Sequence, residues 1–227
     1  SLCAKWAPRE GRHFSNLSKK LALLMYEKNI TNKNEKFYAS KLYRKNIAKL
    51  NKYLDTVEIK MCSENDRWSE IYPGSVPARC LKINRKSFMN LSKNGETKST
   101  KLDRIKCAQI FEKFLEEAIR NPKKKKVHGA KLHPHELVEI YFRGGDSYYY
   151  NTDTPQSQLD LTIEAQWIDL RNRLLESGKL GKFVSMVDTS GSMSGTPMMV
   201  AIALGILISE VCHPAFKNRF LTFSANP

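Results

Sequence analysis

The chain has 227 residues, of which 41% are hydrophobic and 27% are charged, a balance typical of a globular protein with one large domain or two small ones. Its only long apolar run, Met198 to Val211, is too short to span a membrane, so composition argues against a membrane protein. The net charge of +15 favours an acidic partner, most commonly nucleic acid. Lysine greatly outnumbers arginine and asparagine is frequent, so a biased genome would also explain this charge, and both explanations stay open.

The cysteines, at positions 3, 62, 80, 107 and 212, are odd in number and scattered along the chain. None of them has the spacing of a zinc or redox pair, which predicts reduced structural thiols in an intracellular compartment, cytoplasmic or nuclear. The first residues carry no signal-peptide pattern. We expect both ends to be cut from a longer protein, because the last residues have the pattern of a strand that stops just as a sheet begins.

The chain up to residue 177 shows the three-to-four-residue period of helices. The pattern predicts helices that begin near Phe14 and Pro134 and helices that cover residues 35–54, 78–90, 102–120 and 159–175. Residues 1–177 are therefore expected to form a mainly α, helical-repeat-like array. Stacked helix pairs of this kind commonly serve binding.

The helix expected over residues 35–54 has two different faces. Its apolar and aromatic residues stand at helical spacing and are expected to pack: Tyr38, Leu42, Tyr43, Ile47, Leu50 and Leu54. Basic residues occupy the remaining face: Lys41, Arg44, Lys45, Lys49 and Lys52. Such a face is either solvated or in contact with phosphate.

Two further groups of basic residues are candidate nucleic-acid contacts. The first is expected on the outer side of the 78–90 helix and consists of Lys82, Arg85 and Lys86. The second is the densest charge run of the chain, directly after Asn121 and Pro122 end a helix: Lys123, Lys124, Lys125 and Lys126. This run indicates a nucleic-acid contact, a nuclear-import signal or a solvated loop.

Aromatic and histidine residues add two weaker candidates. Three successive tyrosines, Tyr148, Tyr149 and Tyr150, either stack on unpaired bases or hold their loop against the helices. His133 and His135 have a metal-ligating side chain, but two residues apart at a helix start they do not share a face. A metal site at these histidines is therefore not expected.

The pattern changes near residue 178. A short apolar run at 182–187 leads into a loop rich in glycine and serine, then a longer apolar run, then a second short run at 219–224. This predicts the strand, helix and strand that begin an α/β domain over residues 178–227. Ligands of such sheets bind at the carboxyl ends of the strands, where Asp188, Ser190 and Ser192 stand. Their oxygens suit Mg²⁺ or Ca²⁺; the alternative is a turn that caps a helix and binds nothing.

Covalent catalysis does not fit this loop. A nucleophile elbow needs serine between its two glycines, but Met193 is central between Gly191 and Gly195. A phosphate-binding P-loop needs a lysine after its last glycine, where this chain has Thr196. We find no general base for metal-assisted hydrolysis either, so we expect a binding protein and not an enzyme.

The spacing Asp188-x-Ser190-x-Ser192, followed by Gly195, resembles the metal-ion-dependent adhesion motif of von Willebrand factor A-type domains. In those domains the matching Asp and two Ser hold Mg²⁺ directly or through water, and a Thr and an Asp from later loops complete the site. The resemblance therefore implies a Mg²⁺ site of which this chain carries at most half.

The chain as a whole resembles an uncharacterised family of plants, fungi and large DNA viruses, in which a helical region ends in a von Willebrand A-type domain. The resemblance is carried by Cys3-Ala4-Lys5-Trp6-Ala7-Pro8, Tyr43-Arg44, Trp68, Val76-Pro77, Pro134-His135-Glu136-Leu137-Val138, Gln166-Trp167 and the Asp188 motif. More distantly, the layout is similar to the TROVE proteins, typified by the Ro autoantigen, which implies RNA binding by the helical region. A virion is a further location if the chain is viral.

These observations predict a non-enzymatic protein that binds RNA through a basic helical region joined to a metal-dependent A-type module. The alternative is an adaptor in which Mg²⁺ at the Asp188 motif accepts a carboxylate of an acidic protein partner as its last ligand.

Overall fold

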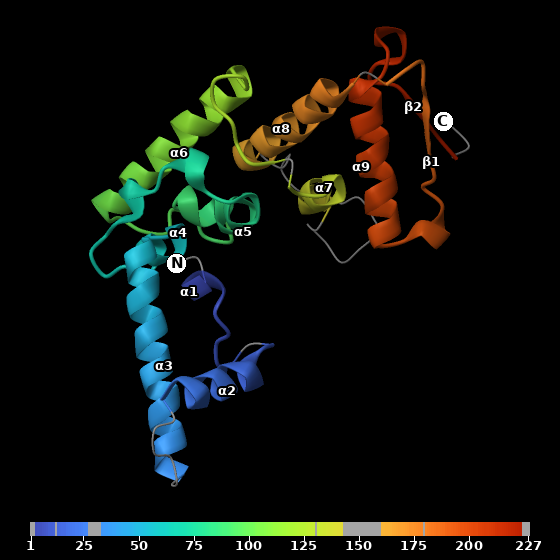
Figure 1. Cartoon of the computed structure of the whole chain (residues 1–227). Helices are drawn as coiled ribbons and strands as arrows, with labels where there is room; N and C mark the ends of the chain where they lie inside the picture. Colours follow the sequence, from blue (N-terminus) through green and yellow to red (C-terminus); the bar gives the residue numbers. More distant parts are fainter. Residues whose placement is uncertain are drawn as a thin grey trace. The chain divides into compact units, whose positions relative to one another are not determined.

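A computed structural model of the chain describes residues 3–11, 13–26, 33–129, 131–142, 160–178 and 180–223. Its described part is mainly helical with a small parallel sheet near the C-terminus, which confirms the predicted fold class (Figure 1). The chain divides into two compact units, residues 1–68 and residues 69–227. The tyrosines at 148–150 lie outside the described residues.

The first unit is helical and is built around a long central helix. Its elements are α1 (Cys3–Trp6), α2 (Ser15–Tyr26), α3 (Lys33–Leu54) and α4 (Val57–Met61). Helix α2 lies against α3 through a small buried cluster of Ala22, Ala39 and Tyr43. The Tyr43 hydroxyl donates a hydrogen bond of 3.2 Å to the Pro8 carbonyl, which fixes the rotation of α3 within the unit.

Part of the face of α3 that was predicted to pack is exposed instead. Tyr38 keeps 59% and Leu50 42% of its surface accessible, whereas Tyr43 keeps only 5%. The physical reason is the narrow contact with α2, which covers the side of α3 that carries Ala39 and Tyr43 and leaves the rest in water. The prediction that Tyr38 and Leu50 pack in the core is therefore wrong.

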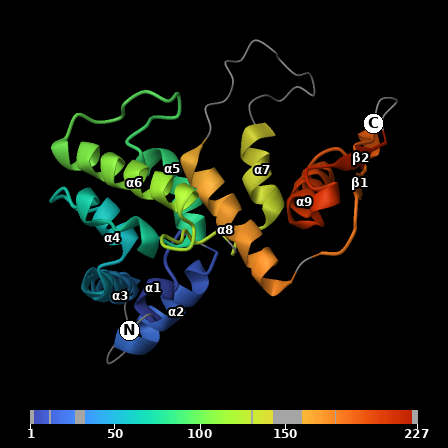
Figure 2. The ribbon, with the colours of Figure 1, turned by 90° about the horizontal axis from the view of Figure 1, so that it is seen from above.

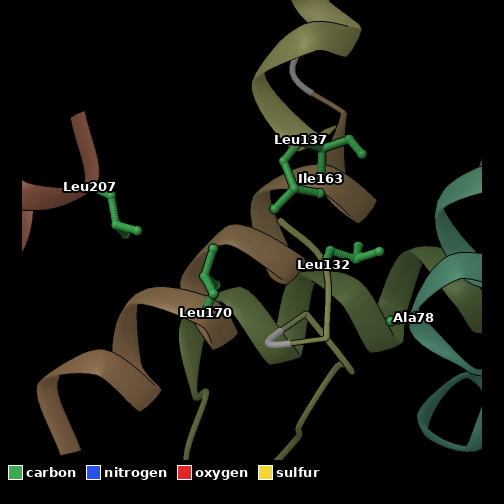
Figure 3. Close-up of a cluster of buried hydrophobic side chains, with 6 residues drawn as sticks. All are labelled: Ala78, Leu132, Leu137, Ile163, Leu170 and Leu207. Atoms are coloured by element: carbon green, nitrogen blue, oxygen red, sulfur yellow. The ribbon is translucent and has the colours of Figure 1, made fainter. Parts of the chain in front are cut away.

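The second unit begins with a helical layer. Its helices are α5 (Ala78–Phe88), α6 (Leu102–Arg120), α7 (Pro134–Phe142) and α8 (Leu161–Ser177), preceded by the short turns η1 (Trp68–Glu70) and η2 (Pro73–Ser75). Figures 1 and 2 show α8 between α6 and α7. The rings of Phe88 on α5 and Phe111 on α6 stack with centroids 4.5 Å apart. A second cluster, shown in Figure 3, joins α5, α7, α8 and α9: Ala78, Leu132, Leu137, Ile163, Leu170 and Leu207.

Polar contacts across long sequence separations hold this layer together. Asp160 caps α8 by accepting from the backbone N–H groups of Thr162 and Ile163, at 3.0 and 3.4 Å. The same carboxylate accepts from Arg85 Nε on α5 at 2.7 Å. Fully buried Gln166 donates from Nε2 to the Ala78 carbonyl at 3.0 Å, so α5 and α8 are joined twice.

The end of the described chain forms a strand, helix and strand. Strands β1 (Ser185–Val187) and β2 (Phe220–Thr222) pair in parallel, with η3 (Gly191–Met193), α9 (Thr196–Val211) and η4 (Pro214–Phe216) between them. A parallel pair needs a crossover connection of this length, and α9 supplies it. Glycine at position 205 lets α9 approach β1 closely, because a Cβ there would overlap the Val187 side chain.

The sheet has one covered face and one open face. Val187 is buried against α9, and the Ser185 hydroxyl donates to the Gly205 carbonyl at 3.3 Å. Because side chains alternate along a strand, Met186 and its pair Leu221 point the other way, and they remain 61% and 47% exposed.

As for membranes, the described part of the chain contains no helix with the length and apolarity that a span requires.

Candidate functional site

The loop after β1 brings the three predicted metal ligands together. Asp188 follows the last residue of the strand, and the Ser190 backbone N–H donates to its Oδ1 at 2.9 Å. The hydroxyl oxygens of Ser190 and Ser192 lie 3.1 Å apart in the turn η3. Gly195, with φ of 87°, then takes the left-handed conformation that glycine adopts readily, and α9 begins at the next residue. The local sequence is thus sufficient to make the oxygens converge.

The electrostatics of this loop keep its carboxylate ionised. Hydrogen bonds from the Ser190 hydroxyl and from the Ser190 backbone N–H hold the pKa of Asp188 below its ordinary value, against a smaller opposing effect of desolvation. At neutral pH the group is therefore a negatively charged oxygen ligand.

The spacing of the oxygens fits Mg²⁺. Neighbouring ligands of an octahedral Mg²⁺, each about 2.1 Å from the ion, are about 3 Å apart. The two serine hydroxyl oxygens have that separation. Of the two Asp188 carboxylate oxygens, only Oδ1 accepts the hydrogen bond from the Ser190 backbone N–H. The described residues contain no group of three or more His, Cys, Asp or Glu that could hold a metal. Any ion here would rely on hydroxyls, water and one carboxylate, so Mg²⁺ binding stays a prediction.

The predicted basic group on α5 is partly engaged inside the fold. Arg85 pairs with Asp160 and also donates from Nη1 to the Lys82 carbonyl at 3.0 Å. Lys82 is half-buried; burial lowers its pKa, and the charges of Glu136 and Glu139 partly offset that effect. Lys86 is exposed and donates to the Lys93 carbonyl at 2.6 Å. Of the three, Lys86 is the most accessible to a phosphate.

The lysine run after α6 forms a turn that is held on both sides. Lys125 lies 2.6 Å from the Glu117 carboxylate and 5.0 Å from the Phe114 ring centroid, so it is bound to α6. Val127, which follows the run, is only 2% exposed and fixes its other end. Between the end of α6 and Val127, the side chains of Lys123, Lys124 and Lys126 are exposed and have no ion pair within the described residues.

One basic surface was only partly recognised from the sequence. On α3 the exposed lysines Lys41, Lys45, Lys49 and Lys52 share a face with the exposed rings of Tyr38 and Tyr53. The lysine spacing of four, four and three residues is the helical signal for this face. Tyr38 was missed because aromatic residues at helical spacing usually belong to the packed side, and Tyr53 was assigned to neither face.

The two histidines at the start of α7 lie close together. The rings of His133 and His135 stack with centroids 5.6 Å apart, and they line a cavity of about 260 Å³ with Pro134, Val200 and Leu204. Within the described ranges no third metal-ligating side chain completes a site with them.

In a comparison with known families, two family models match the chain, one over each region. Residues 1–180 match the family described as "Domain of unknown function (DUF2828)", and residues 182–227 match "Domain of unknown function (DUF7788)". The predicted domain boundary at residues 177 and 178 stays a prediction.

A curated relative comes from Acanthamoeba polyphaga mimivirus. The chain is 30% identical to its "Uncharacterized protein L728" over 228 residues. The matched segment covers 100% of this chain and 35% of that protein. The chain thus spans about a third of the length of the relative. No solved structure matches the chain.

Proposed function

We propose that this chain, which belongs to the family described as "Domain of unknown function (DUF2828)", is a non-enzymatic protein whose basic helical region binds RNA. In this proposal residues 178–227 begin a von Willebrand A-type module, and the helical region acts as it does in TROVE-like proteins. The observation that carries the proposal is the turn of Lys123, Lys124 and Lys126, which exposes three lysines between the end of α6 and buried Val127.

A fixed turn binds a polyanion better than a mobile tail does. The backbone N–H groups of Lys124 and Lys125 donate to the Asn121 carbonyl and Val127 is buried, so the backbone between Asn121 and Val127 loses little freedom on binding. The three exposed ammonium groups have no carboxylate partner among the described residues, so phosphate can approach them without displacing an internal ion pair. Binding through such contacts releases counterions from the RNA and is therefore sensitive to salt.

The test is the affinity of a labelled, mixed-sequence single-stranded RNA across a salt series. Replacing Lys123, Lys124 and Lys126 by glutamine removes three phosphate contacts, which should reduce the salt slope by about 2 and the affinity by about 100-fold at 0.1 M salt. A matched control changes three other exposed lysines, Lys93, Lys98 and Lys106, to glutamine. A salt-independent affinity, or equal losses in variant and control, contradicts RNA binding by this turn.

The Asp188 motif supports a second candidate function, a protein adaptor. Asp188, Ser190 and Ser192 would hold Mg²⁺, and the ion would supply an open position for a carboxylate of an acidic partner. In the full-length protein, Asp188→Ala and EDTA should each abolish capture of such a partner, whereas Ser194→Ala, outside the motif spacing, should not. Capture that survives both treatments contradicts the adaptor.

A further inference from the structure

We infer that the exposed face of α3 formed by Tyr38, Lys41, Lys45, Lys49, Lys52 and Tyr53, named here the α3 lysine face, is a second site that binds single-stranded nucleic acid. It lies in the first compact unit, whereas the turn at Lys123 belongs to the second. The inference therefore stands on its own observations and does not require that turn to bind RNA.

The fold fixes which way the α3 lysine face points. At 3.6 residues per turn, its six residues fall within an arc of about 120° around the helix axis. Ala39 and Tyr43 lie on the other side of α3, buried against α2, and the Tyr43 hydroxyl is hydrogen-bonded to the Pro8 carbonyl. The lysines are consequently held toward solvent by the packing of the opposite side.

The charge of this face is uncompensated. Helix α3 has no acidic residue from Lys36 to Leu54. Three carboxylates of the unit pair with other cations: Glu10 with Arg44 at 2.7 Å, Asp55 with Arg67 at 2.7 Å and Glu58 with Lys5 at 3.5 Å. The four lysines of the face have no ion pair within the described part of the chain. A row of like charges without counter-charges is complementary to a polyanion.

The two tyrosines indicate that the polyanion is single-stranded. Tyr38 and Tyr53 are 59% and 87% exposed, one at each end of the lysine row. Their separation along the helix is about 22 Å at 1.5 Å per residue, room for about six nucleotides at 3.4 Å each. Exposed aromatic rings stack on unpaired bases, whereas the bases of a duplex are already stacked and cannot reach them. Lysines that contact phosphate and rings that stack on bases together form a sequence-tolerant single-strand site.

The experiment is fluorescence anisotropy of a labelled 12-nucleotide mixed-sequence single-stranded RNA, titrated with the whole chain at several salt concentrations. Lys45→Gln with Lys49→Gln removes two phosphate contacts and should reduce the salt slope by about 1.4 and the affinity by about 25-fold at 0.1 M salt. Tyr53→Leu should weaken binding by about 5- to 150-fold and leave the salt slope unchanged. Tyr53→Phe, which keeps the ring, should bind like the wild type.

Matched variants separate a local site from the effect of net charge. Lys19→Gln with Lys20→Gln removes the same charge from exposed positions of α2 and should change affinity little. Lys45→Arg with Lys49→Arg should restore the slope, because arginine also contacts phosphate. Circular dichroism of each variant checks that the helices are intact.

The outcomes distinguish this site from the turn at Lys123. Losses confined to the α3 variants support the inference even if neutralising the turn has no effect. The inference is overturned by losses confined to the turn variant, by equal losses in the α2 control, or by equal affinity for a duplex of the same length. Binding to vesicles of anionic phospholipid without binding to RNA overturns it in favour of a membrane surface.

Discussion

Gly205→Ala should destabilise the second unit, although alanine is the better helix former. In a helix interior alanine is favoured over glycine by about 1 kcal/mol. Against this, the added methyl group overlaps Cγ2 of Val187 on β1. Val187 is 4% exposed and, because it is β-branched, has few alternative rotamers, so it cannot move aside. Overpacking of this kind costs about 1–3 kcal/mol, and we take the upper end because both groups are fixed.

The net effect is a loss of about 2 kcal/mol, the difference between about 3 from overpacking and about 1 from propensity. Urea unfolding followed by circular dichroism measures it. With a slope of about 2 kcal/mol per molar urea, the midpoint should fall by about 1 M. The melting temperature should fall by about 4–8 °C for a chain of this size.

A second variant isolates the cause. Val187→Ala alone should cost about 2 kcal/mol through the loss of two buried methyl groups. In that background the space beside Gly205 is open, so Gly205→Ala should become stabilising by about 1 kcal/mol. The sign of the Gly205→Ala effect therefore reverses between the two backgrounds. If alanine at 205 stabilises the wild-type chain, or destabilises both backgrounds equally, the close contact between α9 and β1 does not exist.

Two further predictions concern the helical layer and its buried thiol. Asp160→Ala removes the cap of α8 and the partner of Arg85 and should lower the melting temperature by about 2–8 °C, whereas Asp160→Asn keeps a capping oxygen and should lower it less. Burial raises the pKa of the Cys107 thiol from 9.0 to about 12, so at pH 8 a thiol reagent should label exposed Cys62 and leave Cys107 unmodified until the chain unfolds. Because the folded-state pKa is the higher one, the stability that Cys107 contributes over Cys107→Ala is fully present below pH 9.0 and should be lost as pH rises toward 12.

The parts of the fold that depend on local pattern could be predicted from the sequence. Helix α6 has the predicted bounds, Leu102 to Arg120, because a regular apolar period ends at Asn121 and Pro122. The convergence of Asp188, Ser190 and Ser192 could be predicted because five residues of one turn bring them together.

The parts that depend on distant partners could not. Arg85 was predicted to face outward, but its partner Asp160 lies 75 residues away, and no local pattern indicates that pair. Tyr38 was predicted to pack because it stands one helical turn before Leu42, yet the contact with α2 covers only the side of α3 that carries Ala39 and Tyr43. Periodicity identifies the faces of a helix, but the size of the neighbouring element decides how much of each face is covered.

The open face of the β1–β2 sheet has a practical consequence for work with this chain. Met186 and Leu221 present an apolar surface, and in the part of the chain that the structure describes each strand has one unpaired edge. Exposed strands of this kind pair with copies of themselves. Purified protein of this length should therefore self-associate as its concentration rises. A binding curve measured in that range would then report the size of an aggregate, so RNA titrations belong at protein concentrations where light scattering finds monomer.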